Sequence, residues 1–159
     1  MKILKWFKHA IQRITKGYSY QDVYDIGGWF LNIVPQMLED MANIENLPVP
    51  ISMIEKAKEM NPNLSEKEID ELELDVKLWK ETLREIAYYL SEGYDPKDEI
   101  NEYSDDVKFE WLEERELTKE EEELQKKFLA REQEIAEYSQ KQLQKGLKMF
   151  SENINMLWW

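Results

Sequence analysis

The feature that most constrains the fold is a run of seven apolar residues spaced alternately by three and four positions. The run consists of Ile69, Leu72, Val76, Trp79, Leu83, Ile86 and Leu90. This spacing places the side chains on one face of a helix and repeats every seven residues. Ser65 and Glu68 form a capping-box pattern before the run, and Gly93 follows it. We therefore expect one unbroken helix over 66–92, in an antiparallel bundle because Trp79 is bulky for a two-stranded coiled coil.

Helical periodicity continues through most of the remaining chain. We expect helices over 2–16, 20–44, 51–60 and 118–157. Ser19 is the expected N-cap of the second, whose apolar face should comprise Val23, Ile26, Phe30, Ile33, Met37, Met41 and Ile44. Asp95-Pro96 suggests the start of another short helix, and Thr118 with Glu121 forms a second capping box.

These patterns predict an all-α helical bundle with a long C-terminal helix. With only five glycines and five prolines, the chain has few of the turn residues that an all-β fold needs. We expect one helical domain over 1–159, divided into a basic amphipathic helix (1–16), a bundle body (17–116) and the long helix (117–159). Arg131 interrupts the apolar stripe of that last helix.

Charge is distributed unevenly along the chain. Residues 1–16 carry five basic side chains and no acid, which leaves −18 for residues 17–159 out of the total of −13. An acidic body repels nucleic acid, so we expect no direct nucleic-acid binding. The basic helix has the pattern of a membrane-surface helix, but docking on the acidic body is the interpretation we favour. No apolar stretch is long enough to span a membrane, and we expect a cytoplasmic protein with no membrane partner.

The residues give no recognisable catalytic or metal-binding pattern, and we expect neither an enzyme nor a cofactor. The chain has no cysteine, and its single histidine has no supporting motif around it. Pairs of glutamates three residues apart could hold magnesium in a nucleotide pyrophosphatase, which stays open as an alternative. Those pairs are Glu68/Glu71, Glu110/Glu113 and Glu134/Glu137.

Three groups of residues are candidates for binding a ligand or a partner. The first combines basic, acidic and aromatic side chains: Arg13, Lys16, Tyr18, Tyr20, Asp22, Asp25 and Trp29. The second is the acidic run Glu120, Glu121, Glu122 and Glu123, which is also what the start of a solvated helix contains. The third is the terminal pair Trp158 and Trp159, which we expect to pack on the body or on a second subunit. Together with the long apolar stripe, this pair predicts a homo-oligomer.

Several short motifs resemble those of a group of small proteins encoded by phages and prophages of Gram-positive bacteria. The motifs here are Tyr18-Ser19, Asp22-Val23-Tyr24-Asp25, Trp29-Phe30, Pro35-Gln36-Met37-Leu38, Trp79, and Gly146-Leu147-Lys148-Met149-Phe150 to Leu157-Trp158. This chain has Tyr20 where the shared pattern has Asp, and Tyr24 where it usually has Trp. The resemblance implies an accessory protein of a mobile element and carries no particular activity.

Our expectation is therefore a phage or prophage accessory protein that binds a host protein, such as an antiviral defence protein. One alternative is a sponge for a small anionic signalling nucleotide, held by Arg13, Lys16, Tyr18 and Tyr20. The two remaining alternatives are a magnesium-dependent nucleotide pyrophosphatase and a structural or assembly protein.

Overall fold

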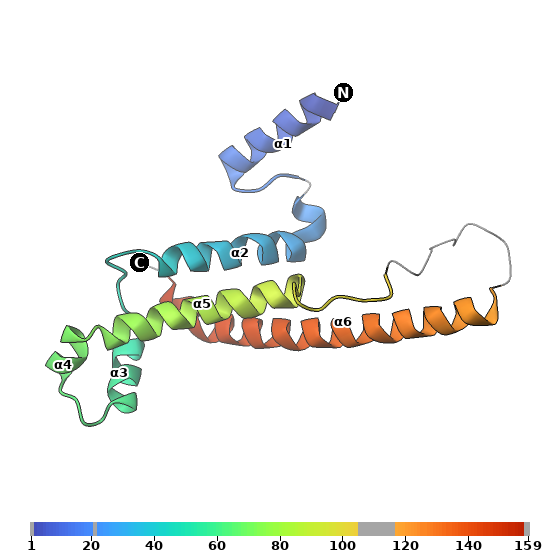
Figure 1. The fold of residues 1–159 in the computed structure, drawn as a ribbon. Coiled ribbons are helices and arrows are strands. Elements are labelled where there is room, and N and C mark those ends of the chain that lie inside the picture. Colours follow the sequence, from blue (N-terminus) through green and yellow to red (C-terminus); the bar gives the residue numbers. More distant parts are fainter. Residues whose placement is uncertain (1, 21, 105–116, 158–159) are drawn as a thin grey trace. The chain divides into compact units, whose positions relative to one another are not determined.

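A computed structural model describes residues 2–20, 22–104 and 117–157 (Figure 1). These residues form six α-helices and no strand, which confirms the all-α class. The helices are α1 (Lys2–Lys16), α2 (Ile26–Ala42), α3 (Ile51–Met60), α4 (Glu66–Glu71), α5 (Leu74–Tyr94) and α6 (Lys119–Asn153). A 3₁₀ turn, η1 (Asp22–Asp25), precedes α2, and a second one, η2 (Ile154–Met156), follows α6. The chain forms two compact units, Met1–Ala87 and Tyr88–Trp159, and the boundary between them falls within α5.

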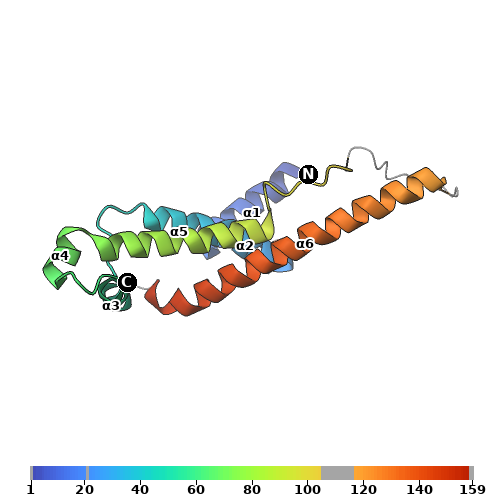
Figure 2. The ribbon, with the colours of Figure 1, turned by 60° about the horizontal axis from the view of Figure 1, so that its bottom comes forward.

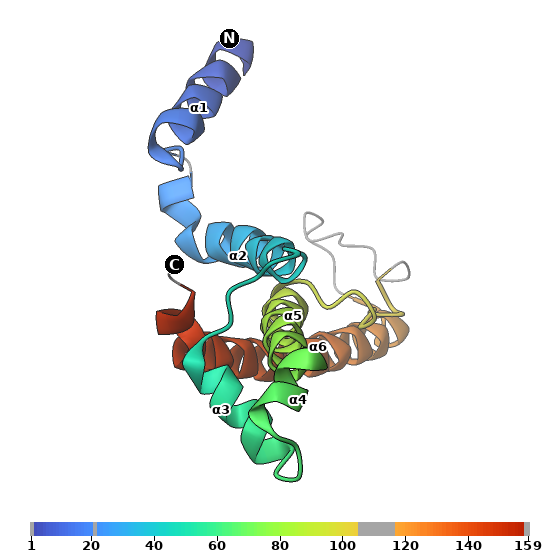
Figure 3. The same ribbon diagram turned by 90° about the vertical axis from the view of Figure 1, so that its left-hand side faces the viewer.

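The predicted unbroken helix over 66–92 is wrong, because the chain turns between α4 and α5. Glu73 adopts a left-handed conformation (φ 52°) and Leu72 is exposed. The turn directs α4 toward α3 (Figure 3). Lys58 of α3 and Glu66 of α4 form an ion pair at 2.7 Å. Ile69 is thereby buried. The capping box at Ser65 and Glu68 is confirmed, but it begins a short helix rather than the long one.

The core of the first unit gathers around α5. Trp79, Leu83 and Ile86 are completely buried, so the central part of the predicted seam is confirmed. The other buried apolar side chains of this unit come from α2, the connection after it, α3, α4 and α5: Leu38, Ala42, Leu47, Met53, Ala57, Ile69 and Ala87. Arg84 of α5 donates a hydrogen bond to the side-chain oxygen of Asn43, directly after α2, at 3.1 Å.

The apolar face predicted for α2 is not the face that the structure buries. The buried residues of α2 are Gly28, Pro35, Leu38 and Ala42, whereas Ile26, Ile33 and Met37 are exposed. Because α2 is apolar on more than one side, its periodicity alone does not determine which side is buried. The folded structure buries the side that carries Leu38 and Ala42 rather than the side that carries Ile33 and Met37.

The second unit is built on α6, a single helix of 35 residues and about 52 Å at 1.5 Å per residue (Figure 2). The long C-terminal helix and its Thr118–Glu121 capping box are confirmed. It packs against the last turns of α5, where Tyr138 donates a hydrogen bond to Glu92 at 3.2 Å. Lys145 contacts both the ring and the hydroxyl group of Tyr89.

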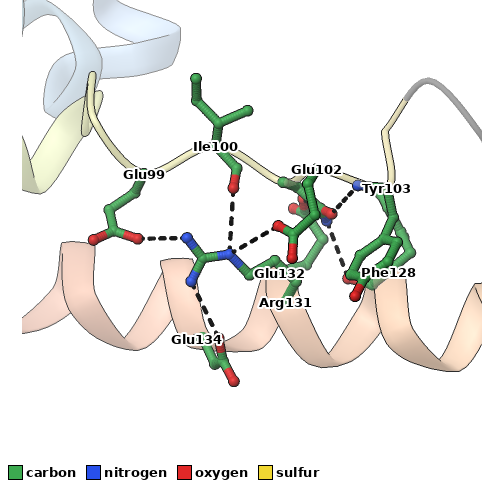
Figure 4. Close-up of polar contacts among 9 residues, drawn as sticks. Glu99, Ile100, Glu102, Tyr103, Phe128, Arg131, Glu132 and Glu134 are labelled. Atoms are coloured by element: carbon green, nitrogen blue, oxygen red, sulfur yellow. Dashed lines mark hydrogen bonds and ion pairs between the residues drawn. The ribbon is translucent and has the colours of Figure 1, made fainter.

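Residues 95–104 form turns that lie along α6, so the short helix expected after Asp95-Pro96 is absent from this described segment. Figure 4 shows how the segment is held. Arg131 donates to the carboxylate of Glu99 at 2.7 Å and to the carbonyl of Ile100 at 3.3 Å, and pairs with Glu102 at 3.5 Å. The buried Asn101 donates to the Phe128 carbonyl at 3.1 Å. The residue that interrupts the apolar stripe of α6 therefore anchors the preceding loop.

Candidate functional site

Six of the thirteen candidate binding residues lie in one short segment, residues 12–25, which joins α1 to α2 and is called the elbow below. Gly17 ends α1 with a left-handed backbone (φ +78°), a conformation that favours glycine. Its amide donates to the Arg13 carbonyl at 3.0 Å, as in a helix C-cap. The chain then turns through η1 into α2.

Side-chain hydrogen bonds fix the conformation of the elbow. Arg13 binds the Asp22 carboxylate with two nitrogens, Nε at 3.1 Å and Nη2 at 2.6 Å. The backbone amide of Ser19 donates to the same carboxylate at 2.6 Å, and that of Tyr20 donates to Gln12 Oε1 at 3.0 Å. The hydrogen bonds from Arg13 and Ser19 hold the pKa of Asp22 well below its ordinary value of 3.8. Asp22 is therefore an ionised carboxylate that accepts the hydrogen bonds of Arg13 and Ser19.

The N-cap of α2 is Asp25, and the expected cap at Ser19 is wrong. Asp25 accepts a hydrogen bond from the Gly28 amide at 2.8 Å. Ser19 instead lies before η1, where its carbonyl accepts from the Asp22 amide at 3.1 Å. The 3₁₀ turn separates the two positions, so Asp22 organises the elbow while Asp25 starts the helix.

The outer side of the elbow is aromatic and apolar. The rings of Tyr20 and Tyr24 meet edge to face with centroids 5.4 Å apart, and the Tyr24 hydroxyl donates to that of Tyr20 at 3.2 Å. This hydrogen bond and burial raise the pKa of Tyr24. Both side chains are nevertheless largely exposed, at 62% for Tyr20 and 77% for Tyr24, and Tyr18 and Val23 are exposed beside them in sequence.

Exposed apolar residues continue from the elbow onto α2. Ile26, Ile33 and Met37 follow one another at helical spacings of seven and four residues, and all three are exposed. The name elbow–α2 surface is used below for Tyr20, Tyr24, Ile26, Ile33 and Met37. The sequence predicted Tyr20 as a binding residue and Ile26, Ile33 and Met37 only as part of one apolar face of a helix. Apolar side chains exposed in this number mark interaction sites more often than ordinary surface.

The structure does not bring all the predicted residues together. Lys16 is exposed at the end of α1, and Trp29 is half-buried in the first turn of α2. The acidic run belongs to the first two turns of α6, where Glu121 completes the capping box and Glu123 pairs with Lys126 at 3.1 Å. Trp158 and Trp159 lie outside the described residues.

Several residues named for the two alternative functions have partners within the chain. The Arg13 guanidinium pairs with the Asp22 carboxylate at 2.6 Å. Of the glutamate pairs, Glu68 caps α4 and Glu134 pairs with Arg131 at 3.1 Å. Glu110 and Glu113 lie outside the described residues. Within the described part of the chain, no three acidic or histidine side chains are placed to hold a metal ion together.

Comparisons with known proteins give no family. No family model matches the chain, and neither the curated proteins nor the solved structures include a detectable match. In the segments that the structure describes, no helix has the length and apolar character needed to cross a membrane.

Proposed function

We propose that this protein acts by binding another protein through the elbow–α2 surface. The observation that carries the proposal is the exposure of Tyr20 and Tyr24 on an elbow whose backbone is fixed by the Arg13–Asp22 pair. Tyrosines are enriched among the residues that dominate protein–protein binding energy. A rigid support lowers the conformational entropy that such side chains lose on binding.

The apolar residues of α2 extend the same surface. Ile26, Ile33 and Met37 have the spacing with which a helix presents anchor side chains to a groove in a partner. The sequence resemblance to phage and prophage proteins makes a host protein, and within that class a defence protein, the partner that we propose. The partner is expected to offer an apolar groove for α2 and polar groups for the tyrosine hydroxyls.

The test compares protein capture by three forms of the full chain in a bacterial host lysate. The first is the wild type, and the second carries Tyr20→Ser and Tyr24→Ser. The third, a matched control, carries Ile51→Ser and Met60→Ser on α3, where the side chains are 75% and 62% exposed. The proposal expects a protein captured by the wild type and the control at equal yield, and at least about tenfold less by the tyrosine variant. Equal capture by all three forms, or by none, contradicts it.

The predicted homo-oligomer is tested with the same variants. Sedimentation velocity of the purified wild type and of the tyrosine variant shows whether the elbow–α2 surface joins two copies of this chain. If the wild type is a dimer and the tyrosine variant a monomer, the proposed host partner is replaced by a second copy.

A further inference from the structure

The helix α1 carries a second exposed apolar face, distinct from the elbow–α2 surface. Phe7, Ile11 and Ile14 follow one another at spacings of four and three, and they are 55%, 57% and 83% exposed. A helix advances about 100° per residue, so these three side chains lie on one side of α1.

The charge of α1 has a single sign. The helix contains Lys2, Lys5, Lys8, Arg13 and Lys16 and no acidic residue. Arg13 is paired with Asp22, which leaves the four lysines as its net charge. Lys8 lies about 100° around the helix from Phe7, and Lys16 lies on the side opposite the apolar face. A cation at the flank of an apolar face can reach phosphate groups while the face itself is buried in acyl chains.

We propose that α1 binds the surface of an anionic lipid membrane, with Phe7, Ile11 and Ile14 inserted at the boundary between headgroups and acyl chains. The proposal goes beyond the protein-binding function, because it uses another surface and another kind of partner. A strongly amphipathic helix with lysines on its polar face and low overall hydrophobicity is the type that lies in this interface. Such binding needs no membrane-spanning segment.

An anionic lipid surface suits the exposed apolar face of α1 and its lysines together. It requires no matching groove, only an apolar face with cations near it, whereas a second copy would have to offer an apolar groove of complementary shape. The net charge of −18 on residues 17–159 repels the anionic lipid and opposes the attraction between the lipid and α1. We therefore expect weak and reversible binding.

Vesicle co-sedimentation of the full chain tests the proposal. The probe vesicles contain equal parts of phosphatidylcholine and phosphatidylglycerol, and reference vesicles contain phosphatidylcholine alone. The apolar variant carries Ile11→Ala and Ile14→Ala, changes that raise helix propensity, so weaker binding cannot come from loss of the helix. The charge variant carries Lys8→Glu and Lys16→Glu. Matched controls are Ile51→Ala with Met60→Ala on α3, and Lys97→Glu with Lys141→Glu at exposed positions of the second unit.

The proposal expects wild-type protein on the phosphatidylglycerol vesicles at low salt and at least about tenfold less on phosphatidylcholine alone. Each α1 variant should bind at least about tenfold more weakly, and the control variants should bind as the wild type does. Absence of wild-type binding, equal binding to both kinds of vesicle, or equal binding by the α1 variants would overturn the proposal. A dimer that the Ile11 and Ile14 changes dissociate, without vesicle binding, would assign this face to a second copy instead.

Discussion

Gly146 of α6 lies against the backbone of Leu90 in α5, so closely that an added Cβ at Gly146 would stand 2.9 Å from the Leu90 amide nitrogen. The contact is reciprocated one turn away, where a Cβ at Gly93 would stand 2.6 Å from the Leu143 Cα. Two glycines thus let the end of α5 and the C-terminal third of α6 approach at backbone distance. Both glycines fall within helices, where they cost about 1 kcal/mol each relative to alanine.

We expect Gly146→Ala to destabilise the protein by about 1–3 kcal/mol, because the overpacking outweighs the gain in helix propensity. Gly27→Ala is the matched control, since a Cβ there meets nothing within 4 Å. That change should be neutral or stabilise by up to about 1 kcal/mol. Urea unfolding followed by circular dichroism measures both. A Gly146→Ala protein as stable as the control would show that α5 and α6 can separate without cost.

The buried part of the heptad run should be sensitive to truncation. Trp79→Ala and Leu83→Ala each leave a cavity at a fully buried site, and we expect losses of about 2–5 kcal/mol in the free energy of unfolding. Leu72→Ala is the control, because Leu72 belongs to the same run but is half exposed in the turn before α5. Its loss should stay below about 1 kcal/mol. Equal losses of unfolding free energy at positions 72 and 83 would contradict the turn before α5 and favour the unbroken helix that the spacing predicts.

Arg131→Lys should loosen residues 95–104 from α6. A lysine has one compact ammonium group, which cannot bind Glu99, the Ile100 carbonyl and Glu134 in three directions as the guanidinium does. We expect faster hydrogen exchange at the Tyr103 and Ser104 amides and a loss of about 1 kcal/mol. Lys126→Gln removes only an exposed pair with Glu123 and should change stability by less than about 0.5 kcal/mol. Unchanged exchange in Arg131→Lys would mean that Asn101 alone holds the segment.

Alkaline pH should destabilise the contact between α5 and α6 through Tyr138. Burial, together with the hydrogen bond to Glu92, raises the pKa of Tyr138 from 10.0 to about 12. Folding therefore favours the neutral phenol, whose contribution is fully present below pH 10 and is lost as the pH rises toward 12. The difference in unfolding free energy between wild type and Tyr138→Phe, measured at several pH values, isolates this group from the other tyrosines. A difference that does not change between pH 8 and the alkaline limit contradicts the assignment.

The helical class of this chain follows from its sequence because periodicity and capping are local. The Thr118–Glu121 box, the ends of α3 and the length of α6 depend on residues within a few positions of one another, so reading them required no knowledge of the fold. The same holds for the amphipathic character of α1, in which every charged residue is basic.

Tertiary structure decided which apolar face is buried and where the chain turns. Ile26, Ile33 and Met37 are apolar like Leu38 and Ala42, and only the folded structure distinguishes the exposed set from the buried one. Glu73 has no intrinsic preference for a left-handed backbone, and the turn there allows α4 to reach α3. Arg13 and Asp22 stand nine positions apart, so no helical spacing relates them, and only the folded elbow makes them a pair. Local propensities thus determined the helices, whereas contacts between segments distant in sequence determined the surface that they leave exposed.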